Sequence, residues 1–116
     1  MPGRKILIVE DEMDLCLLLR DYFTRRKYDV AVANTLADGL ERISSDAPDV
    51  LFLDNNLPDG TAWHNAPSIA ASHPEMFFVF ISGFNPVLPA MPEGARFRTI
   101  EKPISFAELD KQFPVL

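Results

Sequence analysis

The chain has 116 residues and a formal net charge of −6, with 47% hydrophobic and 24% charged residues. This composition suits one small globular domain, and we predict a single domain over residues 1–116. The acidic balance argues against nucleic acid as a partner of this chain. Its sequence has no apolar run long enough to span a membrane, so we expect no membrane association.

The N-terminal residues and the single cysteine predict a cytoplasmic location. An apolar run of only four residues precedes Glu10, which is too short for the apolar part of a secretory signal. One cysteine, Cys16, cannot form a disulfide within the chain, and this usage suits a reducing compartment. We interpret Cys16 itself as a core or helix-surface residue rather than a nucleophile.

The first half of the chain alternates short apolar runs with amphipathic stretches. The β-branched run at 5–9 predicts a strand that is buried on both faces. Residues 11–27 predict a helix, because their apolar side chains recur at helical spacing. A second strand is expected at 29–33, and Thr35 has the character of an N-cap that opens a helix to about Ser45.

The second half continues the same alternation. We expect strands at 50–53, 77–81 and 97–100, a turn at 57–60, and helices at 62–72 and 105–113. Pro67 should interrupt the first of these helices, and Ser105 should cap the second. Trp63, beside the turn, either covers the rim of a site or packs into the core.

The alternation of strands and helices predicts an α/β fold with a parallel sheet, right-handed crossovers and helices on both faces. Ligands bind such sheets beyond the carboxyl ends of the strands. The polar residues at these ends are Glu10, Asp11, Asp54, Ser82 and Lys102. We therefore expect all five to lie at one edge of the sheet.

Each of these residues alone has an ordinary explanation, but together they predict a phosphoryl-transfer site. Acids after a strand are usually helix caps, and Ser82 before Gly83 suits a plain turn. Clustered carboxylates, however, repel one another and need a cation, and oxygen ligands suit Mg²⁺. With that charge neutralised, Asp54 can attack a phosphoryl group in line. Lys102 and the Ser82 hydroxyl can bind the phosphoryl oxygens.

The combined motif resembles the receiver domains of bacterial two-component response regulators. It consists of Ile6–Glu12 (ILIVEDE), Leu53-Asp54 followed by the LPDG turn, Ser82, and Lys102-Pro103. Asp54 and Ser82 are 28 residues apart, and Ser82 and Lys102 are 20 apart. The resemblance implies a flavodoxin-like sheet of five strands in the order 2-1-3-4-5.

The resemblance also implies roles for the site residues. Asp54 would be the phosphoacceptor, and Ser82 and Lys102 would read its phosphoryl state. A Mg²⁺ site would be formed by Glu10, Asp11, Asp54 and the backbone carbonyl of Asn56. The phosphoryl donor would be a histidine kinase or a phosphotransfer protein, and the downstream partner would be a protein that the sequence does not identify.

Two features depart from the usual receiver pattern. Three prolines in residues 83–94 predict that the fourth helix of the family is missing or reduced. The Ser-Gly-Phe sequence at 82–84 resembles a receiver subgroup with such a reduced helix. This segment is either a stiff surface loop or a partner-binding element. Thr99 stands where many receivers have an aromatic residue, so either Phe97 or Phe84 replaces that ring or the output route differs.

Two rival functions remain beside a phosphorylation-dependent signalling switch. A Mg²⁺-dependent phosphohydrolase would need a second acid two residues after Asp54, where this chain has Asn56. We therefore expect that the protein is not an enzyme. A receiver-like interaction module that works without phosphorylation is the alternative, because Thr99 and the proline segment alter the output face.

Overall fold

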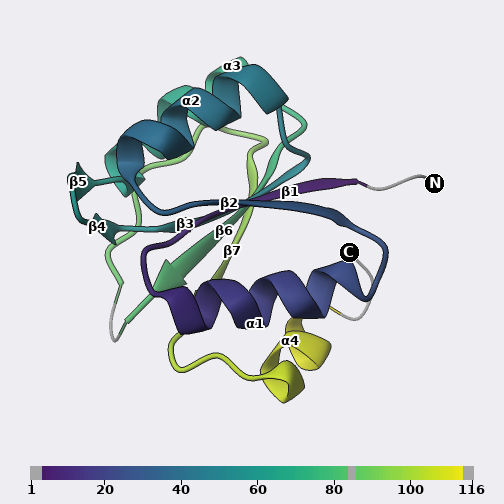
Figure 1. Cartoon of the computed structure of the whole chain (residues 1–116). Coiled ribbons are helices and arrows are strands. Elements are labelled where there is room, and N and C mark those ends of the chain that lie inside the picture. The colour runs from purple at the N-terminus through teal and green to yellow at the C-terminus, as the bar shows by residue number, and fades with distance from the viewer. Residues whose placement is uncertain (1–3, 84–85, 114–116) are drawn as a thin grey trace.

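A parallel sheet of five strands forms the middle layer of the molecule (Figure 1). The structure is a computed structural model that describes residues 4–83 and 86–113. The strand order is β2-β1-β3-β6-β7, which is the predicted order 2-1-3-4-5, so the flavodoxin-like fold is confirmed. The strands are β1 (Lys5–Val9), β2 (Asp29–Ala33), β3 (Val50–Asp54), β6 (Phe77–Ser82) and β7 (Arg96–Glu101).

Helices cover both faces of this sheet, as predicted (Figure 1). Helices α1 and α4 contribute to the apolar cluster on one face, and α2 and α3 contribute to the cluster on the other. Because both faces are covered, every residue of β3 is buried and the strand shows no polar alternation. The helices are α1 (Met13–Thr24), α2 (Leu36–Asp46), α3 (Ala66–Ser72) and α4 (Phe106–Gln112).

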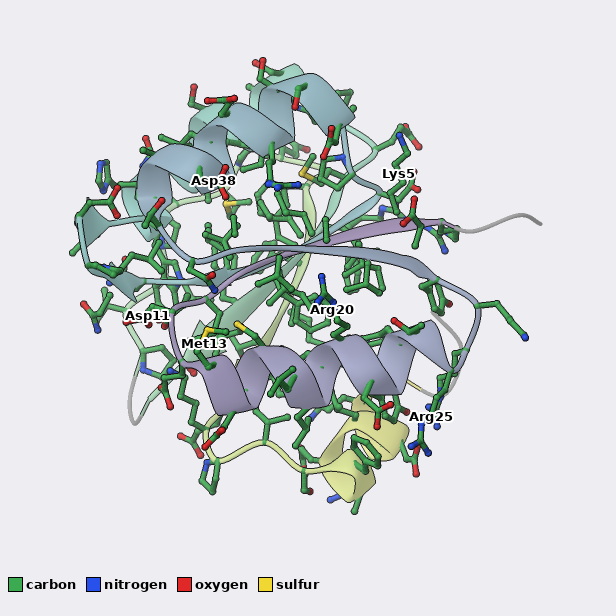
Figure 2. The ribbon with its side chains drawn as sticks, viewed as in Figure 1. Lys5, Asp11, Met13, Arg20, Arg25 and Asp38 are labelled. Carbon is green, nitrogen blue, oxygen red and sulfur yellow. The ribbon has the colours of Figure 1, made fainter. Side chains whose placement is uncertain are left out.

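Aromatic rings fill the face that α1 and α4 cover. The ring of Phe23 packs against those of Tyr22, Phe52 and Phe113, with centroids 4.9, 5.3 and 6.1 Å away. The Tyr22 hydroxyl donates a hydrogen bond to the Asp110 carboxylate at 2.6 Å, which ties α1 to α4. Figure 2 shows side chains filling the space between the sheet and the helices on both sides.

The face that α2 and α3 cover contains several small residues at its helix contacts. A Cβ atom on Gly39 would lie 2.8 Å from Val9 Cγ1, so α2 approaches β1 this closely only because residue 39 has no side chain. Three buried alanines belong to the same apolar cluster, namely Ala62, Ala66 and Ala70. This face therefore combines small residues, which let α2 approach the sheet closely, with the packed rings of Trp63 and Phe80, whose centroids are 5.3 Å apart.

The two predicted helix caps are confirmed. The Thr35 hydroxyl accepts a hydrogen bond from the Asp38 N–H at 3.1 Å, at the start of α2. The Ser105 hydroxyl accepts one from the Glu108 N–H at 3.1 Å, at the start of α4. Each bond satisfies an N–H that has no partner within its own helix.

Helix α1 is shorter than predicted at both ends. It begins at Met13 rather than Asp11, because Glu12 keeps an extended backbone as its N-cap. It ends at Thr24 rather than Lys27, because Lys27 has a φ of 72° and a right-handed helix cannot include that conformation.

The predicted helix over 62–72 is divided, but Pro67 is not the cause. A 3₁₀ turn covers Trp63–Asn65, and α3 begins directly after it. Pro67 lies in the first turn of α3, where its missing N–H has no partner to lose. Pro67 therefore helps to start a helix, and the prediction that it interrupts one was wrong.

The turn predicted over 57–60 is part of a small hairpin. Strand β4 (Asn56–Leu57) pairs antiparallel with β5 (Gly60–Thr61). Gly60 has a φ of 147°, which residues with a side chain rarely adopt.

None of the helices over 4–83 and 86–113 is long and apolar enough to cross a membrane.

The connection between β6 and β7 confirms the predicted loss of a helix. Residues 86–95 contain no helix, because their prolines lack the N–H groups that a helix needs. Three of their side chains, Leu88, Met91 and Ala95, instead pack against the apolar cluster below α2 and α3. An irregular segment therefore covers this part of the sheet.

Candidate functional site

The predicted site residues lie at the carboxyl ends of the parallel strands. Glu10 and Lys102 directly follow β1 and β7, while Asp54 and Ser82 are the last residues of β3 and β6. Carboxylate oxygens of Glu10, Asp11 and Asp54 all lie within 4.8 Å of one another. The structure thus brings together the three acids that the sequence assigned to a metal, while their role as ligands stays a prediction.

Glu10 is fully buried and held by the backbone of the next turn. Its Oε2 accepts a hydrogen bond from the Glu12 N–H at 2.9 Å, whereas its Oε1 has no hydrogen bond to any part of the chain that the structure describes. Burial raises the pKa of Glu10 from 4.5 to about 7; the Glu12 bond opposes this, and the charge of Asp54 adds to it. A positive charge nearby stabilises the charged form of Glu10, and the Lys102 ammonium lies 3.4 Å from its Oε1.

Asp54 shares this environment at the end of the central strand. Only 6% of its surface is exposed. Burial raises the pKa of Asp54 above its usual range, and the positive charge of Lys102 partly offsets the rise. A carboxylate that is poorly solvated and crowded by acids keeps its negative charge near neutral pH more easily when a cation is bound nearby.

The donor set fits a magnesium ion. All three acids supply oxygen atoms, which Mg²⁺ prefers. The buried Glu10 Oε1, which lacks a hydrogen bond, is the kind of atom that a metal ion satisfies. Asn56, whose carbonyl was predicted as a further ligand, begins β4 two residues after Asp54. The role of the Asn56 carbonyl as a metal ligand stays a prediction.

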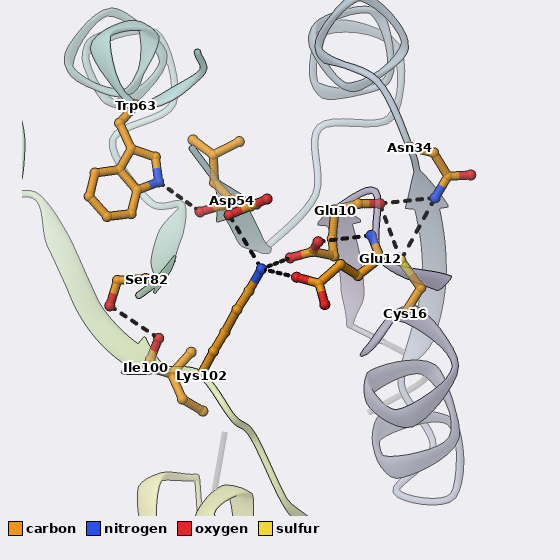
Figure 3. A network of polar contacts seen from close by, with 10 residues as sticks. Glu10, Glu12, Cys16, Asn34, Asp54, Trp63, Ser82, Ile100 and Lys102 are labelled. Carbon is orange, nitrogen blue, oxygen red and sulfur yellow. Dashed lines mark hydrogen bonds and ion pairs between the residues drawn. The ribbon is translucent and has the colours of Figure 1, made fainter. Parts of the chain in front are cut away.

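Lys102 places a single ammonium group among the carboxylates (Figure 3). Its Nζ donates a hydrogen bond to Glu12 Oε1 and lies 3.4 Å from Glu10 Oε1 and 3.8 Å from Asp54 Oδ1. Burial alone would lower the pKa of Lys102, but the bond to Glu12 and the charges of Asp54 and Glu10 raise it. Lys102 thus carries a fixed positive charge beside Asp54.

Ser82 is tied to the strand that leads to Lys102. The Lys102 N–H donates to the Ser82 carbonyl at 2.8 Å, and a cis peptide bond joins Lys102 to Pro103. The Ser82 hydroxyl is buried and lies 3.5 Å from the Ile100 carbonyl oxygen, which is the long limit of a hydrogen bond. This weak contact leaves the hydroxyl ready to take a stronger acceptor.

Sequence reasoning missed two residues that fix the loop after Asp54. The Asn55 side-chain oxygen accepts hydrogen bonds from the N–H groups of Ala62 and Trp63, at 3.2 and 3.0 Å. The Asp59 carboxylate accepts two more from the first N–H groups of α2, at 2.7 and 3.0 Å. These bonds lower the pKa of Asp59. The turn chemistry of Asn and Asp was the available signal, but it does not name the partners.

Trp63 and Cys16 support the site from inside. The Trp63 ring is buried, and its Nε1–H donates to the Leu53 carbonyl at 2.9 Å, so the second interpretation, that it packs into the core, is correct. The buried Cys16 thiol donates to the Glu10 carbonyl at 3.2 Å. Burial, together with the charge of Glu10, raises the pKa of Cys16 to about 11, which agrees with a core residue rather than a nucleophile.

Thr99 lies in β7 opposite Phe80 and is partly buried. The ring of Phe97 is 43% exposed, with its centroid 6.0 Å from that of Phe80. Phe84, the other candidate for the missing aromatic, lies outside the described residues. The replacement of the ring by Phe97 stays a prediction.

A flavodoxin-like sheet with three acids, a buried hydroxyl and a lysine at its strand ends is the arrangement of the receiver class of signalling domains. The response regulator receiver domain family matches residues 6–113, and the chain belongs to this family. Receiver domains are parts of two-component signal transduction systems.

Three known proteins illustrate the relationship. The chain is 35% identical over 104 residues to the transcriptional regulatory protein YxdJ of Bacillus subtilis, covering 88% of this chain and 45% of YxdJ. It is 28% identical over 92 residues to the luminescence regulatory protein LuxO of Vibrio campbellii, covering 77% of this chain and 20% of LuxO. The fold matches a response regulator receiver domain (CheY-like) from Methylobacillus flagellatus, with a TM-score of 0.73, 23% identity and 97% coverage of both chains. The chain thus spans less than half the length of either curated relative.

Proposed function

We propose that this protein is a phosphorylation-dependent signalling switch that accepts a phosphoryl group on Asp54. The observation that carries this proposal is the environment of Asp54: a buried carboxylate at the end of the central strand, grouped with Glu10 and Asp11, with the Lys102 ammonium 3.8 Å away. The family supports a histidine kinase or a phosphotransfer protein as the donor.

Magnesium is the proposed cofactor. Glu10, Asp11 and Asp54 would hold it, together with the backbone carbonyl of Asn56. When bound, the ion neutralises the negative charge that the acids and the phosphoryl group bring together.

The chain's own residues would act in sequence on the phosphoryl group. A carboxylate oxygen of Asp54 attacks phosphorus, and the bond from phosphorus to the donor's histidine nitrogen breaks as an acyl phosphate forms. Lys102 binds a phosphoryl oxygen through its ammonium group. The Ser82 hydroxyl exchanges its weak contact with Ile100 for a second phosphoryl oxygen. The change at Ser82 and Lys102 then alters the partner-binding face.

The proposal assigns the protein a cytoplasmic location, no enzymatic turnover of its own and a downstream protein partner. The relatives are longer than this chain, and any output by a further domain would belong to such a longer protein. The interaction module that works without phosphorylation remains the alternative function, since Thr99 and the segment 86–95 change the face next to Ser82.

Intact-mass spectrometry after treatment with acetyl phosphate and Mg²⁺ tests the proposal. The wild-type protein should gain the mass of one phosphoryl group, and EDTA should prevent the gain. Asp54→Asn keeps the shape of the side chain but removes the nucleophile, so it should gain nothing. Equal added mass on wild type and variant would show that Asp54 is the wrong residue. A folded wild type that gains no mass and binds no beryllofluoride would favour the interaction module.

A further inference from the structure

The side chain of Glu12 makes the closest contact of the Lys102 ammonium, although the motif gave Glu12 no role. The Lys102 Nζ is hydrogen-bonded to Glu12 Oε1, and its distances to Glu10 and Asp54 are longer (Figure 3). The Glu12 side chain is 60% exposed, whereas those of Glu10 and Asp54 are 0% and 9% exposed. Glu12 therefore meets the ammonium at the rim of the site.

The metal cluster and the carboxylates around Lys102 overlap in two residues. The acids grouped for a metal are Glu10, Asp11 and Asp54. The carboxylates that the described chain places within 4.0 Å of the ammonium are Glu10, Glu12 and Asp54. A divalent cation on the first group would compete with the ammonium for Glu10 and Asp54, since both cations are attracted to the same two carboxylates. Glu12 is then the one neighbour that the ammonium keeps.

The position of Glu12 in α1 points the same way. Glu12 is the N-cap of this helix and makes no side-chain capping hydrogen bond, so its carboxylate is not held by the backbone of α1. Its backbone N–H is bonded to Glu10 Oε2 at 2.9 Å. The backbone of Glu12 thus holds a metal-site acid, while its side chain is engaged with Lys102.

We propose that Glu12 is a positioning residue that keeps the Lys102 ammonium at the rim while a metal takes Glu10 and Asp54, and then releases it to the phosphoryl group. Release is favourable because the phosphoryl group offers more negative charge and three acceptor oxygens. The Glu12 carboxylate, by contrast, is exposed and its attraction is screened by water. This inference rests on the proposed function.

A double-mutant cycle on Mg²⁺ affinity, measured by isothermal titration calorimetry, tests whether Glu12 keeps the ammonium away from Glu10 and Asp54. Glu12→Gln keeps the side-chain length and the backbone bond to Glu10. It should weaken Mg²⁺ binding about three- to tenfold, because the ammonium then turns to Glu10 and Asp54. In a Lys102→Met background the same change should alter the affinity less than about twofold.

Asp14→Asn is the matched control for the loss of one negative charge. Asp14 lines the same groove as Glu12 and Lys102, yet it forms no ion pair among residues 4–83 and 86–113. Its variant should weaken Mg²⁺ binding less than Glu12→Gln does, and equally with or without Lys102. Equal effects of Glu12→Gln and Asp14→Asn would overturn the positioning role.

Beryllofluoride binding at saturating Mg²⁺ tests whether Glu12 releases the ammonium to the phosphoryl group. Without Glu12 to compete for the ammonium, Glu12→Gln should bind beryllofluoride about two- to fivefold more tightly than wild type. Glu12→Gln should then weaken the affinity for Mg²⁺ and strengthen that for beryllofluoride, whereas a folding defect would weaken both affinities. A weaker or unchanged beryllofluoride affinity, in a wild-type protein that binds both ligands, would refute the release step alone. A wild type that binds neither would overturn the proposed function, and this inference with it.

Discussion

Strand β3 carries two buried residues whose burial has opposite energetic effects. Phe52 packs against the rings of Phe23 and Phe113, where removal from water is favourable. Asp54 ends the same strand, and there burial raises the pKa and disfavours the charged form. The sheet is thus stabilised along its middle and destabilised at its carboxyl edge. A site that must take a cation and a phosphoryl group is built where the fold can tolerate unfavourable charge.

The largest expected effect comes from the middle of the sheet. Phe52→Ala should lower the free energy of unfolding by about 3–5 kcal/mol, because it removes a fully buried ring from an aromatic cluster. Urea denaturation measures the change. Phe97→Ala, at a ring that is 43% exposed, is the control and should cost less than about 1 kcal/mol. Similar losses for the two variants would contradict the view that burial of Phe52 in the middle of the sheet stabilises the fold.

At the carboxyl edge of the sheet, we expect a substitution of Glu10 to increase the free energy of unfolding rather than lower it. The folded-state pKa of Glu10, about 7, lies above its ordinary value of 4.5, so the folded protein binds more protons between these values. In EDTA, wild-type stability should therefore fall as the pH rises through this window. Glu10→Gln should raise the free energy of unfolding at pH 8 by about 1–3 kcal/mol and give no gain at pH 4.

Urea denaturation at both pH values measures this gain. Glu41→Gln, at an exposed position of α2, is the control and should change little at either pH. A Glu10→Gln variant that is less stable than wild type at pH 8 would show that the buried carboxylate is fully compensated, and the edge would then not be a region of unfavourable charge.

Gly39→Ala examines whether the face below α2 tolerates added volume. Alanine normally favours a helix over glycine by about 1 kcal/mol. Here the new Cβ would lie 2.8 Å from Val9 Cγ1, so we expect a net loss of about 1–2 kcal/mol in the free energy of unfolding. Thermal melts in EDTA are the measurement. A gain in melting temperature would mean that α2 moves away from β1 without cost.

Magnesium should reverse the penalty at the edge. At ten times its dissociation constant, an ion that binds only the folded state adds about 1.4 kcal/mol to the free energy of unfolding. Wild-type melting temperature should rise accordingly in Mg²⁺, and Asp11→Ala should weaken this response while raising the stability in EDTA, because it relieves repulsion. An unchanged wild-type melt across millimolar Mg²⁺ would argue against the metal site.

The sequence predicted the parts of the fold that leave a local pattern. The β3 strand was recognised because its apolar run is continuous, and Thr35 and Ser105 because a cap needs only a short segment. The grouping of Glu10 with Asp54 followed from topology, since parallel strands end at the same edge.

Contacts between residues far apart in sequence left no such pattern. Glu12 is 90 residues from its partner Lys102, and Asp59 is 23 residues from the N–H group at Leu36 that it binds. The need for glycine at position 39 arises from Val9 on a neighbouring strand. These roles depend on how elements pack in space, which composition and periodicity do not encode.

The hydrogen bonds of Asn55 and Asp59 hold the loop on one side of the site in place. Asn55 fastens the loop after Asp54 to the start of the following 3₁₀ turn, and Asp59 fastens it to the first turn of α2. On the other side, residues 86–95 form no helix and are held chiefly by the packing of Leu88 and Met91. We therefore expect a conformational change that begins at Asp54 to move residues 86–95 more than the loop that Asn55 and Asp59 hold. We expect the displacement to run through Ser82 toward β7, at the outer edge of the sheet, because the fewest hydrogen bonds oppose it there.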